Sequence, residues 1–262
     1  MTFSHNFDAT SLREYDIRGI VGKTLSAEDA FAIGRTFGSM VRRNGGRTLV
    51  VGYDGRLSSP MLEEALVQGA VECGLEVTRV GRGPTPMLYY ASAIFEADGA
   101  IMVTGSHNPP DYNGFKMMLA GKPFFGALIK DLGELAAQGN VVAREEGSVR
   151  EADVRDDYVA RLAKDYVGGE RKLKIVWDNG NSSAGDILEK LVAALPGEHI
   201  VLNAAIDGTF PAHHPAPTVA KNLQQLISVV RANGADVGIA FDGDADRFGL
   251  VDHKGAILWG HQ

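Results

Sequence analysis

The feature that most constrains the fold is a repeated order of short apolar run, polar loop and helical pattern. The apolar run at 48–52 leads into a polar loop and then a helical pattern that ends at Gly74. The same order follows the apolar runs at 76–80 and 99–103. Short apolar strands that alternate with helices are typical of an α/β fold around a largely parallel sheet.

The segment before the first of these strands predicts a helix with a defined start. Ser26 is a suitable N-cap, Asp29 stands three residues further on, and Ile33, Phe37 and Val41 repeat at helical spacing. An Arg-Arg-Asn-Gly run then closes the segment.

A second alternating series follows a polar stretch at 138–152, which indicates the approach to a domain boundary. A connecting helix is expected at 153–167, between this polar stretch and the second series. In the second series, the pattern IVWDNGNSSAG before a helix resembles the pattern VVGYDGRLSS before a helix in the first series. We therefore expect an α/β protein with two consecutive domains of similar α/β/α design and mixed, largely parallel sheets. The expected domains span 1–150 and 151–256, and 257–262 reads as the start of a truncated third domain after a hairpin.

Composition and charge exclude several classes of partner. The 262 residues are 45% hydrophobic and 23% charged, enough for a sizeable core, and the formal net charge is -7. This balance offers no basic surface for nucleic acid, and no apolar run is long enough to span a membrane. Cys73 is the only cysteine and the N-terminus has no apolar leader, so we expect a cytoplasmic protein.

A rigid loop presents a serine hydroxyl directly after the apolar strand at 99–103. Residues 104–116, TGSHNPPDYNGFK, contain two prolines and two glycines at the carboxyl end of a strand, where open α/β sheets collect ligands. Ser106 is the hydroxyl of this loop. His107 and Lys116, which we place in the same loop, supply cationic or proton-handling groups that suit phosphoryl transfer better than a plain turn.

A second loop concentrates carboxylates after the apolar strand VGIAF. Asp242, Asp244 and Asp246 stand at alternate positions of DGDADR and can converge on a hard cation such as Mg²⁺. The segment does not match a calcium loop of the helix-loop-helix kind, because Arg247 stands where that loop needs glycine and His253 stands where it needs glutamate. A solvated surface turn is the remaining alternative, although clustered carboxylates without a cation repel one another.

Two further segments carry polar groups. Near the N-terminus, YDIRG contains Tyr15 and Arg18, whose planar fork of donors suits a phosphate. In the loop at 53–59, YDGRLSS, we expect Ser58 or Ser59 to cap the following helix.

Taken together, YDIRG, TGSHNP and DGDADR in this order resemble the α-D-phosphohexomutase family. The segments at 84–91 and 210–217 extend the resemblance over essentially the whole chain, and it is most similar to the phosphomannomutase/phosphoglucomutase type. The chain matches the first two of the family's four domains. The resemblance implies that the sugar-reading third domain and the C-terminal domain are missing, so this chain should be inactive or weakly active alone.

The resemblance also implies roles for the two chemical loops. Ser106 would be a phosphoserine, and an oxygen of its phosphate would complete a Mg²⁺ site with the three aspartates of 242–246. Arg247 would support that loop. Four residues would surround the phosphate: Tyr15, Arg18, His107 and Lys116. Lys116 would serve as a proton-transfer or charge-stabilising group, whereas His213 and His214 are not expected to bind metal, because adjacent side chains in an extended loop diverge.

The implied activity is a phosphohexomutase isomerisation of mannose and glucose phosphates between the 1- and 6-positions, through phosphoserine and hexose 1,6-bisphosphate. Phosphoglucosamine mutases are similar and remain an alternative. So does a metal- and phosphate-binding module without turnover. A Mg²⁺-dependent phosphatase of another α/β class would need an aspartate nucleophile after an early strand, for which Asp54 is the candidate.

Overall fold

The structure is a computed structural model that describes residues 3–169 and 171–259. Its contacts divide the chain into two compact units, one formed by Met1–Gly105 with Pro110–Asp153 and the other by Ser106–Pro109 with Val154–Gln262. Four residues from the middle of the first unit's sequence therefore belong, by their contacts, to the second unit. These four include Ser106.

The first unit is built on one mixed sheet whose described strands run in the order β1-β5-β4-β2-β3-β7, with β6 paired to β5. The strands are β1 (Ile17–Ile20), β2 (Thr48–Tyr53), β3 (Glu76–Arg82), β4 (Gly99–Val103), β5 (Tyr112–Leu119), β6 (Lys122–Phe124) and β7 (Ser148–Glu151). The pairs β4-β2, β2-β3 and β3-β7 are parallel, and β1, β5 and β6 pair antiparallel.

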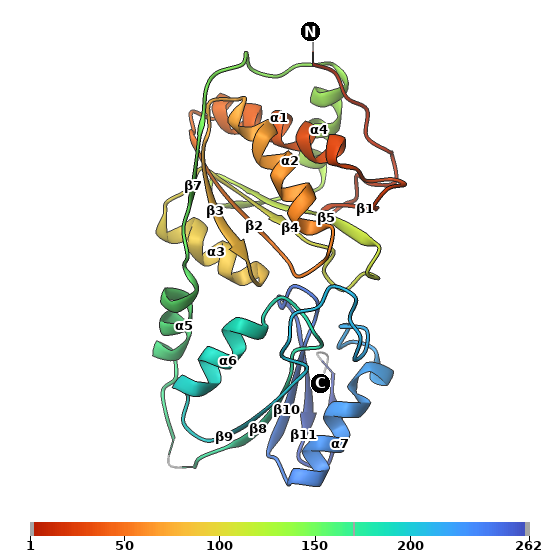
Figure 1. The fold of residues 1–262 in the computed structure, drawn as a ribbon, viewed down its shortest axis with the longest axis vertical. Coiled ribbons are helices and arrows are strands. Elements are labelled where there is room, and N and C mark those ends of the chain that lie inside the picture. The colour runs from red at the N-terminus through yellow and green to blue at the C-terminus, as the bar shows by residue number, and fades with distance from the viewer. Residues whose placement is uncertain (1–2, 170, 260–262) are drawn as a thin grey trace. The chain divides into compact units, whose positions relative to one another are not determined.

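The helices of this unit lie on both faces of the sheet. They are α1 (Ala27–Arg43), α2 (Ser59–Val71), α3 (Thr85–Ile94) and α4 (Ala127–Ala137). In the sheet, β3 lies on one side of β2 and β4 lies on the other, so the direction of winding reverses after β3. Because both crossovers are right-handed, the connecting helices α2 and α3 lie on opposite faces of the sheet. Figure 1 shows α3 on the other side of the sheet from α1 and α2. The carboxyl ends of β2 and β4 meet where the winding reverses, which is where such sheets bind ligands.

Helix α1 has the start that the sequence predicts. The Ser26 side chain accepts a hydrogen bond from the Asp29 N–H, and the Asp29 carboxylate accepts one from the Ser26 N–H, so the capping box is confirmed. The helix packs closely on α2 through glycines. A Cβ placed on Gly34 would lie 2.1 Å from the Leu66 carbonyl oxygen, and one on Gly69 would lie 2.2 Å from that of Phe31. Only glycine allows the two helices this approach.

One local prediction for this unit is wrong. The loop expected over 104–116 is shorter, because β5 begins at Tyr112, so Lys116 lies in a strand opposite Met102 and not in a loop. The polar stretch 138–152 contains β7 at Ser148–Glu151, a strand that the sequence pattern did not predict. All four residues of β7 are exposed, so the strand has no apolar alternation to reveal it.

The second unit repeats the design on a smaller sheet, ordered β12-β11-β10-β8-β9 among the described strands. The strands are β8 (Lys174–Asp178), β9 (Glu198–Leu202), β10 (Val237–Phe241), β11 (Phe248–Asp252) and β12 (Ile257–Leu258). The helices are α5 (Arg155–Lys164), α6 (Gly185–Ala194), the 3₁₀ turn η1 (Ala220–Leu223) and α7 (Gln224–Asn233). Here β8 is parallel to both β9 and β10, and the winding reverses between β8 and β10.

Helices α6 and α7 cover opposite faces of this sheet, and α5 packs beside α6 (Figure 1). The α7 face carries the buried apolar cluster of the unit, which includes Val176, Leu226, Val230 and Val251. The carboxyl end of β8 is Asp178, and Asp242 directly follows β10. The reversal point of this unit therefore lies between two buried aspartates.

The predicted fold class, two α/β/α units with mixed sheets, is confirmed, and in each sheet antiparallel pairs lie toward one edge and parallel pairs toward the other. The hairpin predicted near the end is present, since β11 and β12 pair antiparallel. Residues 260–262 of the expected third-domain start lie outside the described residues, and that domain boundary stays a prediction. Among the described helices, none has the length and apolar character needed to cross a membrane.

Candidate active site

Ser106 is held in an unusual backbone conformation beside the acidic loop. Its φ is +49°, in the left-handed region that costs a residue with a side chain ~1 kcal/mol or more and that clusters at functional sites. The residue is 1% exposed. Its hydroxyl donates to Asp242 Oδ2 over 3.1 Å, and its Oγ lies 3.4 Å from Nδ1 of His107. The serine and the first aspartate, 136 residues apart, thus share one site within the second unit.

The acidic loop between β10 and β11 gathers its three carboxylates. Asp242, Asp244 and Asp246 each offer an oxygen, and these oxygens lie within 4.8 Å of one another. The first two are buried and the third is exposed. Ala245 turns the chain with a φ of +54°, which brings alternate side chains to one side of the loop.

Arg247 supports the loop at its end. Its backbone N–H donates to Asp242 Oδ1 over 3.1 Å, and its Nε lies 4.0 Å from Asp242 Oδ2 and 3.6 Å from Asp246 Oδ1. The half-exposed guanidinium lies near two of the three carboxylates, and the residues 242–247 together carry three negative charges and one positive charge. A donor set of carboxylate and hydroxyl oxygens suits a hard divalent cation such as Mg²⁺. The residues present therefore fit a metal site.

Asp54 organises the start of the serine loop, a role the sequence did not suggest. The carboxylate is 1% exposed and follows β2. Its Oδ2 accepts hydrogen bonds from the Thr104 hydroxyl at 2.8 Å and from the Gly105 N–H at 3.0 Å. The same oxygen lies 3.2 Å from Arg56 Nε, and Oδ1 accepts from the Arg56 N–H and from the Ser59 hydroxyl. These five bonds occupy the carboxylate, which is why it has no room to act as a nucleophile.

The predicted capping of α2 by Ser58 or Ser59 is wrong. The N-cap position of α2 has no side-chain hydrogen bond to the helix. Both hydroxyls instead accept from the Asn113 amide at 2.9 Å, and the Ser59 hydroxyl also donates to Asp54. The serines therefore tie the start of α2 to β5. The segment DGRLSS marks these serines as polar groups, but their partner Asn113 lies on a strand far along the chain.

The remaining predicted site residues belong to the first unit. The guanidinium of Arg18 is 2% exposed and Nη2 pairs with Asp16, whereas Nε and Nη1 have no hydrogen-bond partner within the described part of the chain. Such a buried, incompletely paired cation suits an anionic ligand. Tyr15 is 79% exposed and its ring stacks on Phe125 at 6.5 Å. Lys116 is half-buried on β5.

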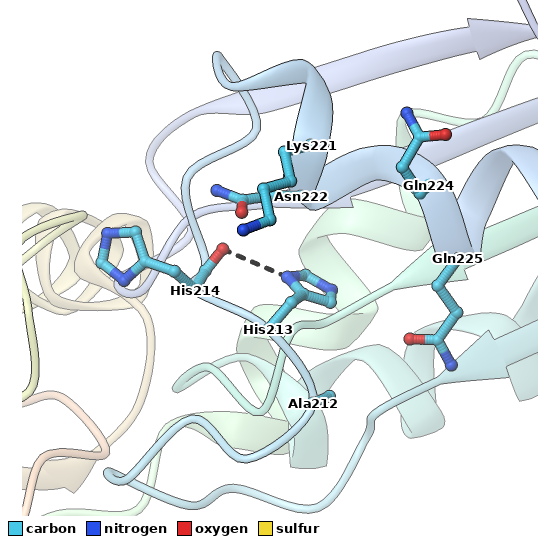
Figure 2. Close-up of a pocket in the computed structure, with 7 residues that line it drawn as sticks. All are labelled: Ala212, His213, His214, Lys221, Asn222, Gln224 and Gln225. Carbon is cyan, nitrogen blue, oxygen red and sulfur yellow. Dashed lines mark hydrogen bonds between the residues drawn. The ribbon is translucent and has the colours of Figure 1, made fainter.

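A separate pocket of about 480 Å³ lies in the second unit (Figure 2). Its lining consists of Ala212, His213, His214, Lys221, Asn222, Gln224 and Gln225. His213 Nε2 lies 2.8 Å from Asp178 Oδ2, and its Nδ1 lies 3.1 Å from the His214 carbonyl oxygen. Both ring nitrogens of His213 face acceptors, so neither is available to a metal ion. The hydrogen bond to Asp178 raises the pKa of His213, against the opposing effect of burial.

The comparison with family models decides the family. The model described as phosphoglucomutase/phosphomannomutase, alpha/beta/alpha domain I matches residues 9–139, and that of domain II matches residues 156–255. The chain belongs to the phosphoglucomutase/phosphomannomutase family. The two models fall on the two units of the structure and cover the described strands of both sheets except β7 and β12.

Relatives within the phosphoglucomutase/phosphomannomutase family are closely similar. A phosphomannomutase/phosphoglucomutase of Pseudomonas aeruginosa is 45% identical over 251 residues, which are 96% of this chain and 54% of the relative. A phosphoglucomutase of Neisseria meningitidis is 44% identical, over 94% of this chain and 54% of its own length. A crystal structure of a family protein from Burkholderia thailandensis has a TM-score of 0.92 at 44% identity, covering 97% of this chain and 57% of that chain. The chain thus spans about half the length of these relatives.

Proposed function

We propose that this chain carries the phosphoryl-transfer centre of a phosphohexomutase, in which Ser106 takes a phosphoryl group from a hexose 1,6-bisphosphate and returns it to a hexose monophosphate. The names of the relatives, phosphomannomutase and phosphoglucomutase, favour mannose and glucose phosphates as the substrates. The complete isomerisation belongs to the proposal for the longer protein that such relatives represent.

The observation that carries the proposal is the 3.1 Å hydrogen bond from the Ser106 hydroxyl to Asp242 Oδ2, inside a group of three converging carboxylates. Ser106 adopts the left-handed backbone that brings the hydroxyl there, a strained conformation that clusters at functional sites. The carboxylates also make a phosphorylated Ser106 unstable unless their charge is offset, because a phosphoserine carries nearly two negative charges at neutral pH. The site therefore couples a phosphate acceptor to a cation site.

We place Mg²⁺ on the carboxylate oxygens of Asp242, Asp244 and Asp246 together with an oxygen at Ser106. A bound divalent cation would neutralise charge on the oxygens of the transferring group. Arg247 steadies the loop through its backbone bond to Asp242. With the loop fixed, the hydroxyl needs no large reorientation before transfer, which is how phosphoryl-transfer sites lower the barrier.

In the proposed half-reaction, Ser106 Oγ forms a bond to phosphorus as the bond from phosphorus to the sugar oxygen breaks. The hydroxyl proton leaves Oγ, and His107 Nδ1 at 3.4 Å is within reach to receive it. A proton is delivered to the sugar oxygen, so the products are phosphoserine and a hexose monophosphate. The reverse transfer, to the free hydroxyl of a hexose monophosphate, regenerates the hexose 1,6-bisphosphate. When that bisphosphate gives its other phosphoryl group to Ser106, the isomeric monophosphate is left. Tyr15, Arg18 and Lys116 are proposed to bind phosphate or stabilise its charge.

A phosphorylation assay tests this proposal on the chain itself. After incubation with glucose 1,6-bisphosphate and Mg²⁺, intact-mass and peptide mass spectrometry should find one added phosphoryl group on Ser106. Ser106→Ala should remove it, whereas Ser11→Ala, a buried serine that bonds the Thr24 carbonyl, should retain it. A phosphate found at another residue, or a folded chain that stays unmodified, would count against the function.

The phosphatase alternative is disfavoured by the geometry of its nucleophile. Asp54 would have to attack phosphorus, yet both of its oxygens are already bound within the first unit and the residue is 1% exposed. Phosphatase activity that survived Ser106→Ala and was lost with Asp54→Asn would revive that alternative.

A further inference from the structure

The loop that follows β8 holds the acidic loop by one backbone carbonyl. Ser183 is 1% exposed, and both its backbone N–H and its hydroxyl donate to the carbonyl oxygen of Gly243, each over 3.2 Å. Gly243 stands between the two buried aspartates of the acidic loop, Asp242 and Asp244. Its carbonyl belongs to the peptide group that leads into Asp244. Fixing that carbonyl therefore fixes the direction in which the Asp244 side chain leaves the backbone.

Gly243 is confined on its other side as well. A Cβ placed on it would lie 2.2 Å from the carbonyl oxygen of Ser106 and 3.7 Å from Pro215. The peptide thus has close neighbours besides the Ser183 donors, and the two loops that carry the chemistry touch at this glycine. Movement of the Gly243 carbonyl would disturb the aspartates and Ser106 together.

The first unit contains a comparable arrangement. There, Asp54 in the segment YDGRLSS bonds Thr104 and Gly105 at the start of the serine loop. In the second unit, Ser183 in the similar segment WDNGNSS bonds the acidic loop. In the first unit, the loop after β2 fixes the loop after the neighbouring parallel strand β4. In the second unit, the loop after β8 fixes the loop after the neighbouring parallel strand β10.

We propose that Ser183 is a positioning residue for a divalent-cation site, acting through the Gly243 carbonyl to hold Asp242 and Asp244 in ligating geometry. This inference rests on the proposed function, which places Mg²⁺ on the acidic loop. Groups that orient metal ligands commonly change metal affinity by a factor of ten or more when they are removed. Ser183 reaches the acidic loop at the Gly243 carbonyl, so we expect its effect to pass through the loop.

The neighbouring Ser182 provides a matched control. It is also buried, and its hydroxyl donates to Asn179 Oδ1 over 2.8 Å within the same loop, without reaching the acidic loop. In isothermal titration of the chain with Mg²⁺, we expect Ser183→Ala to weaken binding about tenfold. Ser182→Ala should keep the affinity of the unmodified chain even where it lowers thermal stability. A merely structural role for Ser183 would make the two variants alike in affinity.

If circular dichroism shows that Ser183→Ala does not fold, a milder variant tests the same role. Ser183→Cys keeps the size of the side chain and replaces the hydroxyl by a weak donor, so it should lose a smaller part of the affinity. Unchanged affinity in the folded Ser183 variants, with binding abolished by Asp244→Asn, would overturn the positioning role and leave the proposed function standing. A chain that bound no Mg²⁺, or bound it equally with Asp244→Asn, would overturn both.

Discussion

His213 sits between two acceptors, which determines its charge. A neutral imidazole has one N–H, yet both ring nitrogens here face oxygens, the Asp178 carboxylate at 2.8 Å and the His214 carbonyl at 3.1 Å. Satisfying both requires the imidazolium. The raised pKa of His213 agrees with this, since the hydrogen bond to Asp178 outweighs the cost of burial.

This geometry predicts a pH-dependent contribution to the stability of the second unit. Because the folded-state pKa lies above the ordinary value of 6.5, the contribution is complete below that value and is lost as the pH rises through the folded-state pKa. His213→Asn should therefore reduce the free energy of unfolding most below about pH 6, with a shrinking difference at higher pH. Urea unfolding followed by fluorescence of Trp177 on β8 measures it.

Ser182→Ala, which removes a buried hydroxyl of the same unit that does not titrate, is the matched control, and its deficit should stay constant across the pH range. A His213→Asn deficit that grew with rising pH would contradict the sign of the pKa shift.

At the scale of elements, the α1–α2 contact depends on two glycines whose backbones face carbonyl oxygens. An alanine in a helix interior normally adds about 1 kcal/mol over glycine. At Gly34 the added methyl would lie 2.1 Å from the Leu66 carbonyl oxygen, a backbone atom that cannot rotate away. The steric cost should therefore outweigh the gain in helix propensity.

Gly34→Ala is expected to lower the free energy of unfolding by about 2 kcal/mol, in the range for overpacked contacts, as measured by chemical denaturation. Gly38→Ala in the same helix is the comparison. Its methyl would meet side-chain atoms of Cys73 and Leu75 at 3.0 Å or more, which can shift slightly. A Gly34→Ala chain as stable as Gly38→Ala would mean that the helices separate without cost.

The sequence predicted those features whose interacting residues lie close together along the chain. The capping box of α1 was predictable, because Ser26 and Asp29 are three residues apart and satisfy each other. The clustering of the carboxylates at 242–246 was predictable for the same reason. The partners of Ser59 and Asp54 were not, since they lie on β5 and after β4, about 50 residues away. The strand containing Lys116 was missed because the prolines before it and the glycine within it suggested a longer loop.

At the scale of the whole molecule, cation binding should stabilise one unit selectively. A ligand that binds only the folded state raises the free energy of unfolding by about 2.7 kcal/mol when its concentration is one hundred times its dissociation constant. The proposed ligands and Ser106 all belong to the second unit by their contacts. The effect should therefore appear there and at the loop 106–109.

Hydrogen exchange followed by mass spectrometry tests this distribution. Mg²⁺ should slow exchange in peptides covering 240–247, 178–184 and 104–109, and leave α1 and α2 unchanged. Asp244→Asn should abolish the protection. Equal protection in α1 and the acidic loop, or protection that persists in Asp244→Asn, would place the cation elsewhere.

Because Ser106–Pro109 groups with the second unit, the polypeptide passes from one unit to the other three times, after Gly105, Pro109 and Asp153. A gene split at the last passage would give two polypeptides, each with an intact sheet, yet the proposed nucleophile Ser106 would be encoded on one and the three aspartates on the other. Neither piece alone would hold the complete centre. Mixing them would report complementation: recovery of phosphoserine only when both pieces assemble.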